Sequence, residues 1–315
     1  MPKVRCDGPC SEQRVAVQRQ QPTHSGRAHS RLATKVAATT LHPMTTPLLS
    51  VHELAALLPE SPLLLDCRFD LADPEEGRRE YHVSHIPGAH YLHLDEDLSS
   101  PIVAGKTGRH PLPDPAKFAQ KLASLGLTPE RPVVAYDDKG GGIAARAWWL
   151  LKSIGHDKVA VLDGGYPFWV IAGQATASGA EETSPAPPYP VSSSGECFTC
   201  DRAQVEALRE DGEHVLIDSR TADRYSGEYE PIDPVAGHIE GAINLPWPEN
   251  LDGKTFKSKE ELRERFRALK DEPQQNVFYC GSGVTACHNV LAYYYAFGKM
   301  PALYPGSWSE YLLGK

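Results

Sequence analysis

No stretch of this sequence approaches the roughly 18 consecutive apolar residues that suggest a membrane-spanning helix. Positive charge is also in short supply, because 32 Lys and Arg stand against 41 Asp and Glu for a net charge of −9. Contacts to nucleic-acid phosphates need clustered Lys and Arg, so this balance argues against a nucleic-acid-binding protein. We therefore expect a small molecule as the partner, and any anion-binding site should be positive only locally.

Cysteine is scarce as well, with seven in 315 residues. An odd number in a chain of this length does not indicate a disulfide framework, and it favours a reducing compartment such as the cytoplasm. One Cys-x-x-Cys motif, Cys197 to Cys200, has no second pair at zinc-ribbon spacing. No metal site is expected there.

Residues 1–43 hold seven Lys or Arg and two acidic residues, and they lack the compact apolar core of a signal peptide. We interpret them as a disordered leader or as an extension upstream of a start at Met44. The alternative is a transit peptide, which would direct the protein to mitochondria. Regular patterning begins after Met44, where Ser50 is a suitable cap for a helix over residues 51–58.

The rest of the chain contains an internal repeat. Three pairs of segments recur in one order: LLDCR (64–68) and LIDSR (216–220), HIPGA (85–89) and HIEGA (238–242), VVAYD (133–137) and VFYC (277–280). This repetition indicates a duplicated domain. We assign residues 44–176 to the first copy, 177–196 to a Pro- and Ser-rich linker and 197–315 to the second copy.

Short Val, Leu and Ile runs alternate with helical segments in each copy. In the first, the predicted strands are 62–66, 132–136 and 158–162, and the predicted helices are 115–125 and 144–154. This alternation predicts an α/β fold in which each domain has a mostly parallel sheet flanked by helices.

Duplication also separates structural features from functional ones. Features found in both copies should serve the fold, as Asp66 with Arg68 and Asp218 with Arg220 do. Features found in one copy are candidates for function.

One such feature is a thiol. Cys280 follows the predicted strand 277–279, whereas the first copy has Asp137 at that place. Ligands of parallel α/β sheets bind beyond the carboxyl ends of strands. An aspartate cannot perform thiolate chemistry, so the second domain is expected to be the catalytic one.

The loop after the thiol can bind an anion. Its backbone N–H groups can turn inward, and the helix predicted over residues 284–297 adds its positive N-terminus. Such surroundings favour the nucleophilic thiolate. The expected anion-binding residues are Gly281, Ser282, Gly283, Val284 and Thr285.

Two other thiolate chemistries fit less well. A cysteine phosphatase needs an arginine six positions after the thiol to hold phosphate, and this position is Ala286. A cysteine hydrolase needs a base beside the thiol, and His288 should point away from the loop.

The duplicated domain with a cysteine at this strand end only in its second copy, together with the loop Cys-Gly-Ser-Gly-Val-Thr-Ala at 280–286, resembles the 3-mercaptopyruvate sulfurtransferases. These are relatives of the thiosulfate sulfurtransferases in the rhodanese family, and the resemblance covers residues 46–311. It implies that Cys280 takes a sulfane sulfur from a small anionic donor as a persulfide. A thiol acceptor, such as thioredoxin or a small thiol, or cyanide then removes the sulfur. No metal or organic cofactor is implied.

The resemblance also assigns roles. Ser282 would belong to a Ser-His-Asp relay that handles the substrate proton, with His85 as its histidine and Asp73 as its acid. The duplication argument makes His85 structural because His238 repeats it. His85 can have both a structural role and a role in the relay only if the turn that carries it, in the first domain, faces the cleft between the domains. Arg224 would bind the substrate carboxylate.

A departure from the family leaves the substrate open. The 3-mercaptopyruvate sulfurtransferases carry a second arginine in the next loop, and residues 227–238 contain none. Thiosulfate therefore remains the alternative donor, and a non-enzymatic persulfide carrier is the alternative class.

Overall fold

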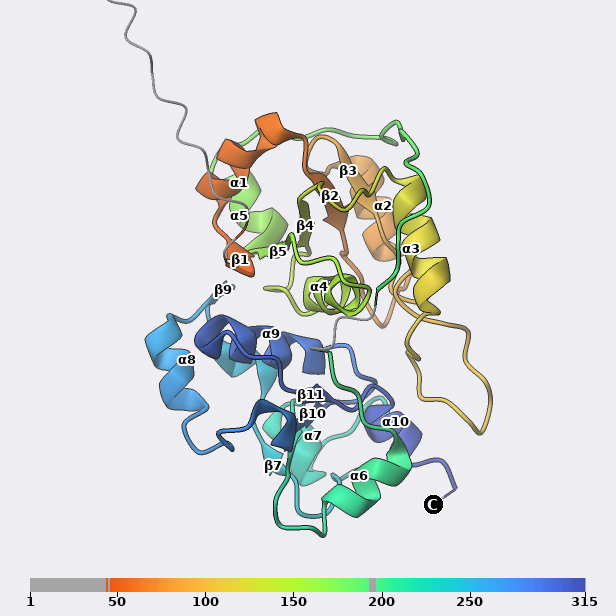
Figure 1. Ribbon diagram of the computed structural model, residues 1–315, viewed down its shortest axis with the longest axis vertical. Helices are drawn as coiled ribbons and strands as arrows, with labels where there is room; N and C mark the ends of the chain where they lie inside the picture. Colours follow the sequence, from red (N-terminus) through yellow and green to blue (C-terminus); the bar gives the residue numbers. More distant parts are fainter. Residues whose placement is uncertain (1–43, 45, 193–196, 315) are drawn as a thin grey trace, which may run out of the picture. The chain divides into compact units, whose positions relative to one another are not determined.

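The computed structural model describes residues 44, 46–192 and 197–314, and the predicted leader over residues 1–43 lies outside these ranges. The described residues belong to one compact unit, His42–Lys315. None of their helices combines the length and apolar composition that crossing a bilayer requires. The unit contains two parallel sheets with helices packed against them (Figure 1), which confirms the predicted α/β fold with two tandem domains.

The first domain is built on a parallel sheet with the strand order β1-β5-β4-β2-β3. Its strands are β1 (Leu48–Leu49), β2 (Leu63–Asp66), β3 (Ala89–Tyr91), β4 (Val133–Tyr136) and β5 (Val159–Leu162). Its helices are α1 (Val51–Leu57), α2 (Glu76–Val83), α3 (Pro115–Ser124), α4 (Ala144–Ser153) and α5 (Gly165–Ile171), with a 3-10 turn η1 (Leu58–Glu60). The order makes β4 the central strand.

The second domain has a parallel sheet with the order β11-β10-β6-β7. Its strands are β6 (Val215–Asp218), β7 (Ile243–Asn244), β10 (Asn276–Tyr279) and β11 (Ala302–Leu303), and β8 (Leu251–Asp252) and β9 (Thr255–Phe256) form a separate antiparallel pair. Its helices are α6 (Arg202–Leu208), α7 (Ala222–Ser226), α8 (Lys259–Arg265), α9 (Ala286–Phe297) and α10 (Ser307–Tyr311), with 3-10 turns η2 (Trp247–Asn250) and η3 (Pro273–Gln275). Thr199 bridges to β11 in parallel, where β1 pairs with β5 in the first domain, so the two sheets share one strand order.

Local sequence explains these elements. The central strands β4 and β10 are buried along their whole length, as apolar strands of a sheet covered on both faces should be. Ser50 caps α1, as predicted, and forms a capping box with Glu53. The predicted strands and helices of the first copy agree with the observed ones to within one residue at each end.

The segment after α5 runs along the first domain. Ala177 pairs with His85 in an antiparallel bridge, and the N–H of Ala186 donates to the Ala123 carbonyl at 2.8 Å. Apart from that bridge, residues 177–192 form neither helix nor strand.

Helices α4 and α9 join the two domains, and Figure 1 shows them facing each other between the two sheets. The ring centroids of Trp148 in α4 and Tyr294 in α9 lie 5.5 Å apart. The largest apolar cluster runs through both helices and continues into both sheets. The domains therefore share one core, which fixes the carboxyl ends of their strands relative to each other.

The paired Asp and Arg residues of the two copies are structural, as the duplication predicts. Arg68 Nη2 lies 2.7 Å from Asp66 Oδ2, and Arg220 Nη2 lies 2.6 Å from Asp218 Oδ2. All four side chains are buried, and each arginine also donates to a backbone carbonyl further along the chain. Each pair therefore ties a strand end to the following segment.

Replacing Arg68 with Met should lower the free energy of unfolding by about 3–5 kcal/mol, because it leaves the Asp66 carboxylate buried without its counter-charge. Chemical denaturation monitored by circular dichroism measures the loss. The matched control is Arg78→Met, since Arg78 makes exposed ion pairs with Glu75 and Glu96 and should cost less than about 1 kcal/mol. Equal losses in the two variants would contradict the structural role of the buried pair.

Candidate active site

Cys280 directly follows β10 at the carboxyl end of the second sheet and is 2% exposed. Its Sγ accepts a hydrogen bond from the Gly283 N–H at 3.2 Å, and its own N–H donates to Ser307 Oγ at 3.1 Å. Helix α9 begins at Ala286, so its positive N-terminus lies at the end of this loop. The predicted order of strand, thiol, loop and helix is confirmed.

The curvature of the loop depends on Gly283. Its φ is +76°, and a Cβ at this position would lie 2.2 Å from the Pro305 carbonyl oxygen, so only glycine fits. The turn directs the Gly283 N–H at the sulfur. The N–H groups of Ser282, Val284 and Thr285 form no hydrogen bond to any residue in the described part of the chain, which leaves them available to an anion.

The equivalent loop of the first domain demonstrates what this geometry binds. Asp137 follows β4 as Cys280 follows β10, and its carboxylate accepts hydrogen bonds at 2.8–2.9 Å from backbone N–H groups of its own loop and of the following helix start. The donors are Lys139, Gly141, Ile143 and Ala144. This cradle is thus filled by an internal carboxylate. With a thiol in place of the aspartate, the second cradle can bind an anionic sulfur.

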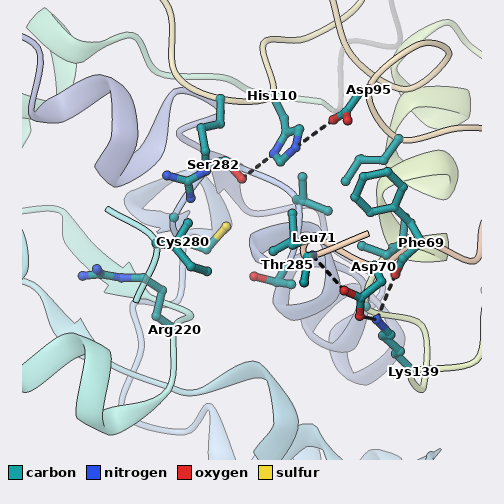
Figure 2. A pocket seen from close by; sticks show the side chains of 18 of the residues that line it. Phe69, Asp70, Leu71, Asp95, His110, Lys139, Arg220, Cys280, Ser282 and Thr285 are labelled. Carbon is teal, nitrogen blue, oxygen red and sulfur yellow. Dashed lines mark hydrogen bonds and ion pairs between the residues drawn. The ribbon is translucent and has the colours of Figure 1, made fainter. Parts of the chain in front are cut away.

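Ser282 contacts a histidine of the first domain. His110 Nδ1 lies 2.7 Å from Ser282 Oγ, and His110 Nε2 lies 3.1 Å from Asp95 Oδ1. Figure 2 shows the imidazole between the hydroxyl and the carboxylate. The three side chains form a Ser-His-Asp chain that crosses the boundary between the domains.

Burial, together with the positive charges of Arg146 and Arg109, lowers the pKa of His110 to about 3. Burial raises the pKa of Asp95. The imidazole is therefore neutral near pH 7. With the ring proton on Nε2, facing Asp95, the Nδ1 atom accepts the hydrogen bond from the Ser282 hydroxyl.

Arg146 holds the two halves of this arrangement together. It lies in α4 and is fully buried. Its Nη1 donates to the Gly283 carbonyl and its Nη2 to the His110 carbonyl, both at 3.1 Å. A single side chain thus joins the thiol loop to the segment that carries the histidine.

The predicted placement of His85 beside Ser282 is wrong. The ring of His85 stacks on Tyr81 at 4.1 Å, and its Nε2 lies 3.2 Å from Glu181. Its counterpart His238 stacks in the same way on a tyrosine of the second domain. The duplication argument, which predicts a structural role for both histidines, therefore agrees with the structure, whereas the placement implied by the family resemblance does not.

The predicted placement of Asp73 is also wrong. Its carboxylate is exposed and pairs with Arg79, which is exposed as well. Neither residue lines the cavity that contains Cys280.

Sequence reasoning missed His110 and Asp95, although a signal was present. His110 lies in the segment Gly-Arg-His-Pro at 108–111, which the second copy does not repeat. Applied to histidines, the rule that single-copy features are functional candidates favours His110 over His85.

Cys280 opens into a cavity of about 880 Å³ formed by both domains. The first domain contributes apolar side chains, including Phe69, Leu71 and Ile102, and the second contributes Ile232 and Thr285. Figure 2 shows Phe69, Leu71 and Thr285 around the space beside Cys280. The cavity suits a small molecule with an apolar part and a few polar groups.

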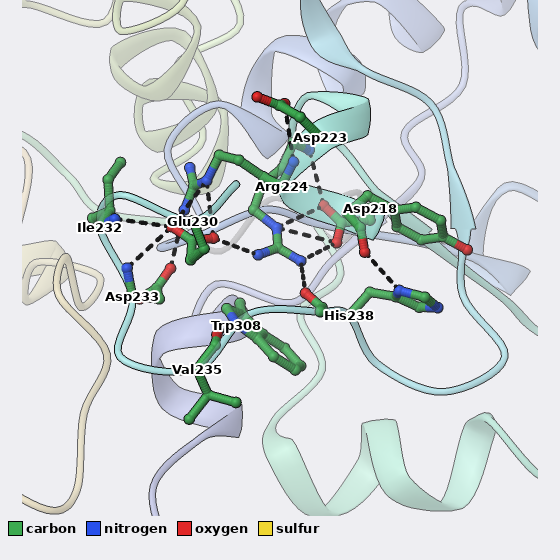
Figure 3. A network of polar contacts seen from close by, with 12 residues as sticks. Asp218, Asp223, Arg224, Glu230, Ile232, Asp233, Val235, His238 and Trp308 are labelled. Atoms are coloured by element: carbon green, nitrogen blue, oxygen red, sulfur yellow. Dashed lines mark hydrogen bonds and ion pairs between the residues drawn. The ribbon is translucent and has the colours of Figure 1, made fainter. Parts of the chain in front are cut away.

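Arg224 lines this cavity, as predicted for a substrate-binding residue, but it already has partners. Its Nη2 lies 2.8 Å from Glu230 Oε1 and 3.1 Å from Asp233 Oδ2. Figure 3 shows Glu230 and Asp233 beside Arg224. Glu230 also contacts Arg220 at 3.0 Å. The side chains of both acids are buried, so they hold the arginine side chain in one position.

Other thiols and histidines do not join the site. Cys287 is fully buried, and burial raises its pKa to about 12. His288 Nε2 lies 3.0 Å from the Gly140 carbonyl oxygen, and its ring stacks on Phe256. As expected, this histidine points away from the thiol.

Among the described residues, one group could present ligands to a metal ion: Glu75, His93 and Glu96. Arg78 already pairs with both glutamates, and His93 Nε2 lies 3.1 Å from the Pro74 carbonyl oxygen. These contacts satisfy the group without a metal.

The chain matches the family described as Rhodanese-like domain twice, over residues 50–172 and 201–313. It is 48% identical over 271 residues to a probable 3-mercaptopyruvate sulfurtransferase of Pseudomonas aeruginosa, covering 84% of this chain and 94% of that protein. It is 35% identical over 257 residues to the thiosulfate sulfurtransferase of Bos taurus, covering 79% of this chain and 84% of that protein. The structure of the 3-mercaptopyruvate sulfurtransferase from Leishmania major aligns with a TM-score of 0.75 at 33% identity, covering 86% of this chain and 75% of that one.

The two matched ranges agree with the two domains of the structure. The chain belongs to the rhodanese family, as a tandem-domain member related to the 3-mercaptopyruvate and thiosulfate sulfurtransferases.

Proposed function

We propose that this protein is a sulfurtransferase that moves sulfur from 3-mercaptopyruvate, through a persulfide on Cys280, to a thiol or cyanide. The observation that carries the proposal is the loop around Cys280, whose counterpart in the first domain binds a carboxylate through four N–H groups. The relative of Pseudomonas aeruginosa supports the choice of donor.

The first half-reaction balances with the groups present. The Cys280 thiolate attacks the sulfur of 3-mercaptopyruvate, a sulfur–sulfur bond forms and the carbon–sulfur bond breaks. The carbon keeps the electron pair as the enolate of pyruvate, which takes up the proton of the former substrate thiol. Pyruvate leaves, and the persulfide anion on Cys280 is stabilised by the loop N–H groups and the N-terminus of α9.

Ser282, His110 and Asp95 handle that proton. Neutral His110 accepts from the Ser282 hydroxyl and donates to Asp95, so Ser282 can receive a proton from the substrate and return one to the enolate carbon. Asp95 holds the imidazole in the required tautomer.

In the second half-reaction an acceptor thiolate attacks the outer sulfur of the persulfide, which frees the Cys280 thiolate. The acceptor is a thiol such as thioredoxin or a small thiol, and with cyanide the product is thiocyanate. Cys67, Cys200, Cys280 and Cys287 are free thiols, which supports a reducing compartment such as the cytoplasm.

The charge of the site favours 3-mercaptopyruvate over thiosulfate. Three guanidiniums that line the cavity are matched by three carboxylates: Arg109, Arg220 and Arg224 by Asp218, Glu230 and Asp233. The cluster has no excess positive charge to hold the thiosulfate dianion, whereas 3-mercaptopyruvate brings one carboxylate.

Replacing Cys280 with Ser should abolish sulfur transfer and leave the melting temperature nearly unchanged, because a hydroxyl is a poor nucleophile near pH 7. Intact mass of the wild type, incubated with 3-mercaptopyruvate without a reductant, should increase by one sulfur atom. Full turnover in the serine variant would exclude the persulfide mechanism. A protein that loads sulfur but does not turn over with cyanide or thiols would be a carrier.

The donor preference is tested by comparing pyruvate release from 3-mercaptopyruvate with thiocyanate formation from thiosulfate at the same cyanide concentration. We expect the larger kcat/KM with 3-mercaptopyruvate. A larger value with thiosulfate would overturn the charge argument and assign the protein to the thiosulfate sulfurtransferases.

Replacing His110 with Gln should lower kcat with 3-mercaptopyruvate on the order of a hundredfold, because the proton transfers lose their base. Since the pKa of His110 is lowered to about 3, the wild-type rate should show no inflection from this residue between about pH 5 and pH 8. Adding Ser282→Ala should cost little more, since the two residues act as a unit. His85→Gln is the matched control and should retain turnover below its melting temperature. A larger loss of kcat in this variant than in the His110 variant would indicate that His85, and not His110, belongs to the relay.

A further inference from the structure

The two helices that join the domains each reach across to the loop of the opposite domain through their third residue. Arg146 in α4 donates from Nη1 to the Gly283 carbonyl at 3.1 Å, and His288 in α9 contacts the Gly140 carbonyl through Nε2 at 3.0 Å. Each glycine is the fourth residue after the end of its central strand, β10 or β4. The two contacts are therefore equivalent, and only the side chains that make them differ.

These equivalent side chains differ in charge. Burial lowers the pKa of His288 to about 4, so its imidazole is neutral near pH 7. Arg146 is buried as well, and burial lowers its pKa, but a guanidinium stays protonated in proteins. The thiol loop therefore has a buried positive charge where the corresponding loop of the first domain has a neutral ring.

The difference in charge matches the residue that each loop surrounds. The first domain has the carboxylate of Asp137, and the second has the thiol of Cys280. A free carboxyl group is ionised well below pH 7, whereas a free thiol has a pKa of about 8.5. A thiol thus needs an additional positive charge to become an anion near pH 7, and a carboxyl group does not.

No carboxylate competes for the charge of Arg146. Every Lys and Arg that lines the cavity is paired with an acid: Arg109, Lys139, Arg220 and Arg224 with Asp233, Asp70, Asp218 and Glu230. Arg146 instead donates to the backbone carbonyls of Leu98, His110 and Gly283, and it forms no ion pair with an acid in the described part of the chain. A buried cation without a counter-ion is costly, and an anionic sulfur nearby would offset that cost.

The charge of Arg146 lies one residue away from the reactive sulfur. Gly283, whose carbonyl binds Arg146, donates its own N–H to Cys280 Sγ at 3.2 Å. Arg146 therefore fixes the turn that directs this N–H at the sulfur. Cys287 Sγ also donates to the Gly283 carbonyl, at 3.3 Å, but burial raises the pKa of Cys287 to about 12 and this thiol stays neutral. Cys280 is left as the sulfur that can carry the negative charge.

We propose that Arg146 is a positioning residue for sulfur transfer: its buried positive charge favours the anionic form of the Cys280 sulfur, and its contact with Gly283 holds the loop N–H on that sulfur. This inference rests on the proposed function, in which the sulfur reacts as a thiolate and persists as a persulfide anion. The side chains that line the cavity do not include Arg146. It therefore acts on the sulfur through the loop and not on the donor.

Alkylation of Cys280 by iodoacetamide tests this role without relying on turnover. The reagent is neutral and reacts with the thiolate, so its rate, followed by mass spectrometry of the Cys280 peptide, reports how far the sulfur is ionised. Arg146→Gln and Arg146→Met remove the charge, and Arg146→Lys keeps it. His288→Gln is the matched control, because it changes the equivalent contact to the other loop. Rates are measured at about pH 7 and about pH 10, below the melting temperature of each variant.

In Arg146→Gln we expect the alkylation rate at about pH 7 to fall by about tenfold to a hundredfold, as loss of a charged hydrogen bond implies. At about pH 10, where free thiols are ionised, the difference from the wild type should disappear. In pyruvate release from 3-mercaptopyruvate near pH 7, kcat should fall while KM changes by less than about threefold. Arg146→Lys should recover part of the rate, and His288→Gln should match the wild type at both pH values.

A loss of equal size at both pH values would mean that Arg146 only shapes the loop, and no loss at either would mean that its charge is not needed. Either result would overturn the proposal. Arg146→Met decides in the same way if Arg146→Gln does not fold. A wild type that releases no pyruvate, while the neutral variants lose alkylation rate at about pH 7 alone, would refute the proposed function and leave the role of Arg146 standing.

Discussion

The structure depends on one constraint. In each domain several backbone N–H groups converge beyond the end of the central strand, and they need a hydrogen-bond acceptor. The carboxyl ends of parallel strands meet at the same edge of a sheet. Where a strand is followed there by a tight loop and the start of a helix, several backbone N–H groups are left without partners. The first domain satisfies them with the carboxylate of Asp137. The second domain has Cys280 at the same place, and the Gly283 N–H of its loop donates to the sulfur. One fold thus yields a structural loop and a candidate catalytic loop by a single change of side chain.

That loop becomes a site only because the two domains share a core. Packing of α4 against α9 brings the segment that carries Arg109 and His110 onto the second domain. Arg146 then ties this segment to the thiol loop through two backbone carbonyls. A buried guanidinium without a carboxylate partner is costly unless its donors are satisfied, and here the carbonyls of both domains satisfy it. The position of the relay and the integrity of the interface therefore depend on the same side chain.

The charged side chains of the cavity are also paired with one another. Arginines and buried carboxylates alternate from Arg109 through Asp233, Arg224 and Glu230 to Arg220. Each buried charge has a partner, which limits the desolvation cost, and the guanidiniums still present unused N–H groups toward the thiol. This row of side chains therefore offers donors to an anion and carries no net excess of positive charge of its own.

The sequence by itself determined the duplicated α/β fold, the limits of three strands and three helices of the first copy and the thiol between a strand and a helix, because periodicity and turn chemistry are local properties. It also marked Asp66 with Arg68 as structural through repetition. It did not determine the partners of Ser282. His110 lies far from Ser282 in the chain, and the family resemblance led instead to His85 and Asp73, which lie in other surroundings. Nor did it reveal that Arg109 lies beside Gly281. Contacts that cross the boundary between two domains depend on how their cores pack, and only the tertiary structure decided them.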